Sequence, residues 1–282
     1  MINQFKCALS PVAFSRDRLN IDPDPWQQQV MMSPDKRILL NCSRQSGKST
    51  IAAIIALHTA LYRPGSLILL ISPSLRQSSE LFKKVTENLK KLQPKQKLRE
   101  DNKLSMTLEN GSRVVSLPSG EATIRGFSGA TLIIEDEASR VDDNLYRAIR
   151  PMLAVSGGRL FLMSTPWGKR GHFFEEWTGN NYWVRIEIPA TKCPRITPEF
   201  LDEERTALGD WWFMQEYMCH FGETADSLFS YDVIQAALSD DVQPLFPELC
   251  KKPIAATVSA PVNTWISDDV KPLFGPDGEI QL

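Results

Sequence analysis

Two short stretches of the sequence carry residue types that could act on phosphates. The first, 42–50, reads CSRQSGKST and joins an apolar run to an Ala/Ile/Leu-rich segment. Backbone N–H groups at such a strand-to-helix turn converge on one point, and the helix N-terminus adds partial positive charge. The second, 132–138, reads LIIEDEA and ends an apolar run in three carboxylates. Together the two stretches predict a site for a polyphosphate and its metal ion.

The side chains of the first stretch fit a phosphate-binding loop. We expect Lys48 to reach the β- and γ-phosphates, Ser49 to hold Mg²⁺ through its hydroxyl, and Gly47 to let the backbone approach the ligand closely. The other positions expected at the ligand are Ser43, Gln45, Ser46 and Thr50. The usual pattern has glycine where Cys42 stands, although a small side chain still fits. A helix N-terminus without a ligand is the alternative interpretation.

The acidic stretch supplies the other half of this chemistry. Asp136 is predicted to hold Mg²⁺ through water, and Glu137 to act as the general base that polarises the attacking water. We expect these residues to end the strand directly beside the strand of the phosphate loop. Glu135 occupies a position where an apolar residue is more usual, so a register shifted by one residue stays open. A surface cluster of acids at a strand end is the alternative.

Two further segments could complete the site. Gln27 precedes the phosphate loop, and its amide could read the adenine edge while Trp26 walls the pocket. An ordinary polar helix face is the alternative for both. The hydroxyls of Ser164 and Thr165, followed by Pro166, end another apolar run and are placed to sense the γ-phosphate and to move. A plain strand-to-helix turn is the alternative there.

An alternation of strands and helices is needed to bring these residues together. Apolar runs predict strands at 37–40, 67–71, 132–138, 158–164 and 182–188, and helical patterns predict helices at 51–61, 73–92, 144–153, 197–208 and 210–220. This spacing is typical of βαβ crossovers, so we predict an α/β fold with a mostly parallel, doubly wound sheet. Asn110-Gly111 predicts a hairpin between strands at 105–108 and 113–117 at one edge. Residues 1–24 predict a turn-rich leading segment.

Composition limits the classes of protein that fit. The chain has 282 residues, 42% of them hydrophobic, and a formal net charge of −2, so it can bury a core but has no overall basic field. Five scattered cysteines without CxxC spacing argue against a disulfide framework and a structural zinc site. No apolar run approaches the roughly 18 residues of a membrane span. We expect a soluble, intracellular protein with no membrane partner.

One local stretch, 83–103, departs from this balance of charge. It contains eight Lys or Arg and three Asp or Glu, a net charge of +5. A solvated helix face and a track for DNA both fit this composition.

The ordered set of motifs resembles the ATPase domain of the large terminase subunit of tailed bacteriophages, the motor that packages DNA into the procapsid. The similarity runs from about residue 20 to about residue 238 and includes an arginine inside the phosphate loop, Arg44, which is a feature of these packaging ATPases. Besides the stretches above, it involves 73–76 (PSLR), 125–126 (RG) and 164–168 (STPWG). The resemblance implies a RecA/ASCE-like P-loop NTPase with a small helical lid, and ATP and Mg²⁺ as its ligands.

The resemblance also implies roles for individual residues. Gln27 would lie at the adenine, and Arg44 would contact the phosphates and take part in catalysis. Family members work as rings in which an arginine enters the neighbouring subunit's site. Arg125 best matches that arginine, with Arg140 as the second choice. The segment 164–166 would couple hydrolysis to movement.

Domain organisation and partners follow from the same resemblance. The chain would divide into an N-terminal segment with the adenine-side motif (1–36), a P-loop ATPase core (37–190), a lid subdomain (191–228) and a truncated or loosely ordered tail (229–282). The expected partners are double-stranded DNA, the portal protein, the small terminase subunit and further copies of this chain in a ring. The expected location is the cytoplasm of a bacterial host.

The C-terminal part departs from the family pattern. Full-length large terminases carry a nuclease domain that begins with an apolar strand ending in a metal-binding Asp. Residues 228–231 (LFSY) resemble the approach to that domain, but no such strand follows in the Pro-rich stretch 243–282. We therefore predict no nuclease activity in this chain, and a separate nuclease subunit could supply it. A helicase-like or other DNA-dependent ATPase, and an inactive prophage remnant that binds nucleotide without turnover, are the alternative functions.

Overall fold

The computed structural model describes residues 2–118, 126–180, 182–223, 233 and 237. The chain divides into two units, Met1–Leu228 and Phe229–Leu282. Every helix and strand named below lies in the first unit. The tail predicted at 229–282 lies outside the described residues, apart from 233 and 237.

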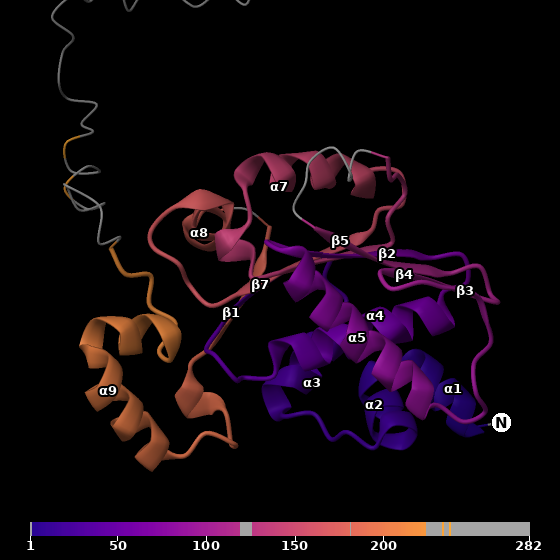
Figure 1. The fold of residues 1–282 in the computed structure, drawn as a ribbon, viewed down its shortest axis with the longest axis horizontal. Coiled ribbons are helices and arrows are strands. Elements are labelled where there is room, and N and C mark those ends of the chain that lie inside the picture. Colours follow the sequence, from indigo (N-terminus) through magenta and orange to yellow (C-terminus); the bar gives the residue numbers. More distant parts are fainter. Residues whose placement is uncertain (1, 119–125, 181, 224–232, 234–236, 238–282) are drawn as a thin grey trace, which may run out of the picture. The chain divides into compact units, whose positions relative to one another are not determined.

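A sheet of eight strands organises the described part of the chain, in the order β3-β4-β5-β2-β6-β7-β1-β8 (Figure 1). The strands are β1 (Arg37–Cys42), β2 (Leu67–Ser72), β3 (Leu98–Asp101), β4 (Ser105–Leu108), β5 (Arg113–Pro118), β6 (Leu132–Asp136), β7 (Arg159–Ser164) and β8 (Val184–Ile188). From β5 to β8 all neighbours run parallel, whereas β3, β4 and β5 are joined antiparallel. The predicted mostly parallel sheet with an edge hairpin is confirmed.

Side-chain alternation along the central strands explains the two layers of helices around the sheet. In β1, Ile38 and Leu40 pack into one core cluster and Leu39 into the other. Because successive side chains point to opposite faces and both faces are covered, a central strand becomes a continuous apolar run. One face carries α1 (Ile2–Leu9), α2 (Pro11–Leu19), α3 (Pro25–Met32), α4 (Lys48–Tyr62) and α5 (Leu75–Lys91), and the other carries α7 (Asp143–Ile149) and α8 (Gly171–Thr178) (Figure 1).

A smaller apolar cluster forms around α9 (Pro198–Glu216). It contains Ala190, Leu201, Phe213 and Tyr217. Gly209, with φ 78° and ψ 160°, breaks α9 into two helical pieces, a backbone conformation that glycine adopts without a steric penalty. The two helices predicted on either side of this position are therefore confirmed, with the second ending at Glu216.

The structure differs from the sequence predictions at several short elements. The first 24 residues contain α1 and α2, and Ser10 caps α2 by accepting a hydrogen bond from the Ala13 N–H at 3.1 Å. The segment after the 164–168 motif forms α8, and the lysine-rich stretch contains β3. The helix predicted at 144–153 ends at Ile149 and continues as a 3₁₀ helix, Arg150–Leu153, since Pro151 cannot donate the next helical hydrogen bond. Within the described residues, every helix falls short of the length and apolar character needed to cross a bilayer.

Candidate nucleotide-binding site

The phosphate loop and the acidic stretch meet at the carboxyl edge of the sheet. The loop follows β1 and the acids end β6, and β7 lies between these two strands. The expectation that the two strands are neighbours is therefore wrong by one strand. The motifs still touch, because the Ser49 hydroxyl donates a hydrogen bond of 3.2 Å to Asp136 Oδ2. Parallel strands bring both motifs to the same edge even with a strand between them.

Two left-handed residues shape the loop. Gln45 has φ 59° and Gly47 has φ 93°. A Cβ atom on Gly47 would lie 2.7 Å from Gln27 Nε2 and 3.3 Å from Arg195 Nη2. Glycine is therefore required at position 47 both by its backbone angle and by the lack of space.

A cavity of about 600 Å³ opens over the loop. Among the described residues, its wall contains five cationic side chains and one carboxylate, Glu137. The cations are Arg44, Lys48, Lys84, Arg140 and Arg195, and Thr50, Gln77 and Thr165 add polar groups. This excess of positive charge suits a ligand that carries several negative charges, such as a polyphosphate.

Lys48 and Glu137 form an ion pair at the base of the cavity. The Lys48 Nζ atom lies 3.0 Å from Glu137 Oε1, and the lysine is 8% exposed. Burial alone would lower the pKa of Lys48, but the charges of Glu137 and Asp136 outweigh burial and raise it. The lysine is therefore held in its charged form beside the two acids.

Asp136 and Ser49 together make a donor set that fits Mg²⁺. Both are oxygen ligands, and this ion commonly takes one or two protein ligands while water and phosphate oxygens fill its other positions. Burial raises the pKa of Asp136 to about 6, and Glu137 adds to this rise, whereas Lys48 and Ser49 oppose it. A bound cation would favour the ionised carboxylate further. The described residues hold no group of three or more His, Cys, Asp or Glu that could enclose a metal by themselves.

The backbone turns sharply at Glu137, directly after β6. Glu137 has φ 56° and ψ 42°, a left-handed conformation that is uncommon for residues other than glycine and is often found at functional sites. The Ser164 hydroxyl at the end of β7 donates to Glu137 Oε2 at 3.4 Å, and the Ser139 hydroxyl lies 2.7 Å from that of Ser164. Ser139 also donates to the Thr165 carbonyl at 2.7 Å. The acidic turn and the 164–166 segment are thus connected.

Gln27 braces the loop in this structure. Its Oε1 atom accepts a hydrogen bond from the Asp24 N–H at 2.9 Å, and its Nε2 atom donates to the Ser46 carbonyl at 3.4 Å. Arg195 donates to the same carbonyl at 3.1 Å and pairs with Asp24 at 2.8 Å. Trp26 is buried beside it, and its indole N–H has no partner among the described residues.

Arg44 is paired with the lid helix. Its guanidinium forms an ion pair with Glu216 at the end of α9, and its backbone N–H donates to the Glu216 carbonyl at 3.0 Å. Hydrogen bonding to Glu216 raises the pKa of Arg44 against the effect of burial. Arg140 stacks over the Trp167 ring, 4.0 Å from its centroid, and lies 3.9 Å from Glu216 Oε1. Both arginines therefore converge on one lid carboxylate.

Three of the predicted positions lie elsewhere. Ser43 is buried, donates its N–H to the Ile188 carbonyl at 2.9 Å and is absent from the cavity wall. Pro166 is also buried and outside the wall. Arg125 lies outside the described residues.

Sequence reasoning missed two residues of the site and one network behind it. Arg195 and Glu216 reach the loop from about 150 and 170 positions away, and no local motif marks them. Behind the acidic stretch, His172 Nε2 lies 2.7 Å from Glu135 Oε1 and His172 Nδ1 lies 3.0 Å from Asp143 Oδ1. The unusual buried acid at position 135 was the available signal.

This network also settles the register of β6. Glu135 lies on the face of α7 and α8, whereas Asp136 faces the phosphate loop. Burial alone would lower the pKa of His172, but its hydrogen bonds and charge interactions with Glu135 and Asp143 outweigh burial and raise it. The assignment of the loop-facing acid to Asp136 therefore needs no shift by one residue.

Residues 39–236 match the family described as "Terminase large subunit, T4likevirus-type, N-terminal". The chain belongs to this family. It is 28% identical over 251 residues to the large terminase subunits of Thermus phage G20c and Thermus virus P23-45. These alignments cover 75% of this chain and 51% of each relative. The chain thus spans about half the length of the curated relatives it matches.

Solved structures share the fold. The ATPase domain of the Thermus phage P74-26 large terminase superposes with a TM-score of 0.67 at 23% identity, covering 76% of this chain and 99% of that chain. The HK97 bacteriophage large terminase gives a TM-score of 0.56 at 17% identity, covering 86% of this chain and 53% of that one. The large terminase of another, thermophilic bacteriophage, solved in complex with ADP, gives 0.56 at 10% identity, covering 70% and 51%. The chain therefore has the RecA/ASCE-like P-loop fold that was predicted.

Proposed function

We propose that this chain is a Mg²⁺-dependent ATP hydrolase that drives double-stranded DNA into a viral procapsid. The carrying observation is the contact between the two motifs, in which Lys48 pairs with Glu137 and Ser49 bonds to Asp136 inside a cationic cavity. Membership of the terminase large subunit family supports the packaging role. The large terminase of the thermophilic bacteriophage has been solved with ADP and with ATP-γ-S, which supports a nucleotide as the ligand.

Nucleotide binding would rearrange two ion pairs. The N–H groups of the loop and of the first turn of α4 surround the phosphates, and Lys48 moves from Glu137 to a phosphate oxygen. Arg44 can do the same by leaving Glu216. Each move exchanges a protein carboxylate for a phosphate, so the ligand competes directly with the acids that hold these cations in the nucleotide-free arrangement.

Hydrolysis would then begin at Glu137. Once Lys48 has left it, this carboxylate is free to accept a proton from a water molecule in the cavity. The water oxygen forms a bond to the γ-phosphorus while the bond from that phosphorus to the ADP oxygen breaks, which yields ADP and inorganic phosphate. Mg²⁺ held by Ser49 and Asp136 would neutralise charge on the phosphates.

The bond from Ser164 to Glu137 gives a route from this chemistry to movement. A change at Glu137 reaches β7 through Ser164 and the following loop through Ser139 and Thr165. This is the expected role of the 164–166 segment as the coupling motif. In the ring, Arg125 is proposed to enter the neighbouring site, because Arg140 already lines the cavity of its own chain.

The remaining parts of the proposal concern organisation. The adenine-side segment (1–36), the ATPase core (37–190), the lid (191–228) and the tail (229–282) are proposed as functional divisions. The portal protein, the small terminase subunit and double-stranded DNA are the proposed partners, in the cytoplasm of a bacterial host. Gln27 would need to release Asp24 or Ser46 to read the adenine.

Phosphate release from Mg-ATP tests this function, measured with and without procapsids that carry the portal. We expect turnover that requires Mg²⁺, is stimulated by procapsids, and is lost in Lys48→Ala but kept in Lys97→Ala, which changes an exposed lysine away from the cavity. Protection of DNA from added nuclease would report packaging. Turnover that persists in Lys48→Ala would contradict the ATPase assignment. Turnover without stimulation or protected DNA would contradict the packaging role.

A further inference from the structure

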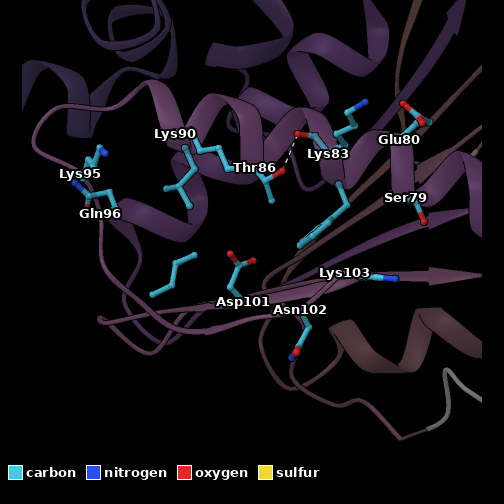
Figure 2. Close-up of a pocket in the computed structure, with 13 residues that line it drawn as sticks. Ser79, Glu80, Lys83, Thr86, Lys90, Lys95, Gln96, Asp101, Asn102 and Lys103 are labelled. Carbon is cyan, nitrogen blue, oxygen red and sulfur yellow. Dashed lines mark hydrogen bonds between the residues drawn. The ribbon is translucent and has the colours of Figure 1, made fainter.

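A second hollow lies between α5 and the β3 segment, away from the nucleotide cavity. It has a volume of about 740 Å³ and shares no lining residue with that cavity. One face of α5 borders it, with Ser79, Lys83, Thr86 and Lys90 at helical spacing. Figure 2 shows Asp101, Asn102 and Lys103 across from this face, with Lys95 and Gln96 closing one end. We call this hollow the α5 groove.

The floor of the α5 groove is apolar. Phe82, Leu89 and Leu98 line it, and all three belong to the core cluster on that face of the sheet or pack against it. Phe82 is 4% exposed and Leu89 6% exposed, so neither offers a flat surface on which a nucleotide base could stack. The floor can accept small numbers of aliphatic or aromatic side chains that enter from above.

The rim of the α5 groove is cationic. Lys83, Lys90, Lys95 and Lys103 lie around it, and none of them forms an ion pair with a carboxylate in the part of the chain that the structure describes. This is the same stretch whose sequence carries a net charge of +5. Unpaired lysines around an apolar floor favour a ligand with acidic ends and an apolar centre.

Two acids interrupt the rim. Glu80 and Asp101 both line the groove, and in Figure 2 Asp101 points into the hollow. A continuous row of phosphates would be repelled at these points, whereas a carboxylate can accept hydrogen bonds from the backbone N–H groups of a peptide. β3 is the outer strand of the sheet and pairs only with β4 among the described strands. One edge of its backbone can therefore also bond to an extended segment.

We propose that the α5 groove binds a short peptide segment of a partner protein, in which apolar side chains are flanked by aspartate or glutamate. The apolar residues occupy the floor over Phe82 and Leu98, the acidic residues pair with the lysines of the rim, and backbone N–H groups bond to Asp101. This inference goes beyond the proposed hydrolysis and does not depend on it. It assigns the +5 stretch to protein recognition, in place of a DNA track or a solvated face.

Selection from a displayed library of random peptides of about 12 residues, on the full chain, tests the proposal. The groove variant is Lys83→Glu/Lys103→Glu. The control variant, Lys91→Glu/Lys97→Glu, makes the same change in net charge at exposed lysines outside the groove. Equal ATP affinity of the variants would show that both remain folded. Enriched peptides are then measured for binding to each protein, beside versions whose apolar residues are replaced by serine.

We expect enriched peptides with leucine, phenylalanine or tryptophan between acidic residues. Binding should fall about tenfold or more in the groove variant, less than about twofold in the control, and about tenfold on serine replacement. Equal binding by the groove variant, or enrichment of peptides without this pattern, would overturn the proposal. So would a groove variant that loses affinity for a mixed-sequence DNA duplex while no such peptide is selected, because the groove would then serve nucleic acid.

Discussion

Position 47 shows how strictly single residues are specified in this site. Its backbone has φ 93°, and a Cβ atom there would meet Gln27 Nε2 at 2.7 Å. Gly65, with φ 72°, has a similar backbone but no atom within 4 Å of such a Cβ. The two glycines therefore separate the cost of the backbone angle from the cost of the clash.

Gly47→Ala should abolish ATP binding and lower the free energy of unfolding by more than Gly65→Ala does. We expect about 1–2 kcal/mol for Gly65→Ala, which strains only the backbone, and unchanged ATP affinity. Equilibrium denaturation and a nucleotide-binding titration would measure both effects. Removing the clashing group with Gln27→Ala should recover part of the stability of Gly47→Ala. Equal costs for the two glycines would refute the steric argument.

His172 makes stability depend on pH. Its interactions with Glu135 and Asp143 raise its pKa in the folded protein above the ordinary value of about 6.5. A raised folded-state pKa contributes its full stability below about pH 6.5 and loses it as the pH rises through the folded-state pKa. From about pH 6.5 upward, the free energy of unfolding of the wild type should therefore fall more steeply than that of His172→Gln.

Denaturant titrations at several pH values measure this slope. His220→Gln is the matched control, because His220 is exposed and outside the network. It should keep the slope of the wild type. A wild-type slope that persists in His172→Gln would show that another group titrates in this range.

The chemistry of single residues could be predicted only where it lies in local motifs. Lys48, Ser49, Asp136 and Glu137 follow from two short stretches, and the structure brings them together. Glu216 could not be predicted, because it reaches Arg44 from another subdomain and nothing near it in the sequence marks it. Long-range partners of this kind need the fold itself.

At the scale of elements, α9 is the part that can respond to the nucleotide. Its last residue, Glu216, holds Arg44 and approaches Arg140, so the lid competes with a polyphosphate for the same cations. Directly after α9, the Tyr217 carbonyl accepts a hydrogen bond from the Ala190 N–H at 2.7 Å, which fixes the end of the helix close to β8. Binding at the loop would therefore loosen or shift α9 from a fixed C-terminal end.

Glu216→Gln should raise ATP affinity by about two- to tenfold, because an uncharged amide competes less well for Arg44. Arg44→Ala should lower the affinity, since a phosphate contact is lost. Titration with a fluorescent ATP analogue would measure both. Glu204→Gln, which changes another lid acid on the same helix, is the control and should leave the affinity unchanged. Weaker binding by Glu216→Gln would mean that the carboxylate helps the site and does not restrain it.

The predictability of the elements followed their burial. Central strands such as β2 and β7 are covered on both faces, so their sequences are continuous apolar runs that are easy to recognise. Helices α1 and α2 were missed because they are short and get their stability from packing, which the sequence alone does not display. The position of β7 between β1 and β6 was also missed, since strand order depends on long-range pairing.

At the scale of the whole molecule, assembly would complete the site in trans. Arg140 lines the cavity of its own chain, which leaves Arg125 as the arginine proposed for the neighbouring subunit. Arg125→Ala chains should bind ATP normally as monomers, while their assemblies hydrolyse at least about 10³-fold more slowly, as when an arginine finger is removed from a GTPase. Mixing with Glu137→Gln chains should restore part of the activity, because each variant supplies what the other lacks.

Phosphate-release rates across a series of mixing ratios would measure this rescue. Arg140→Ala is the comparison, and it should weaken ATP binding by the monomer. No rescue at any ratio, or loss of ATP binding by Arg125→Ala monomers, would count against action in trans.

The most direct test of the account is single-turnover hydrolysis by Glu137→Gln, measured beside its affinity for Mg-ATP. The amide keeps the shape of the side chain but cannot accept the proton, and it also releases Lys48 for the phosphates. The account predicts ATP binding at least as tight as in the wild type, with the chemical step slowed by about 10² to 10⁴. Hydrolysis at the wild-type rate by Glu137→Gln would contradict it, because another group would then have to be the base.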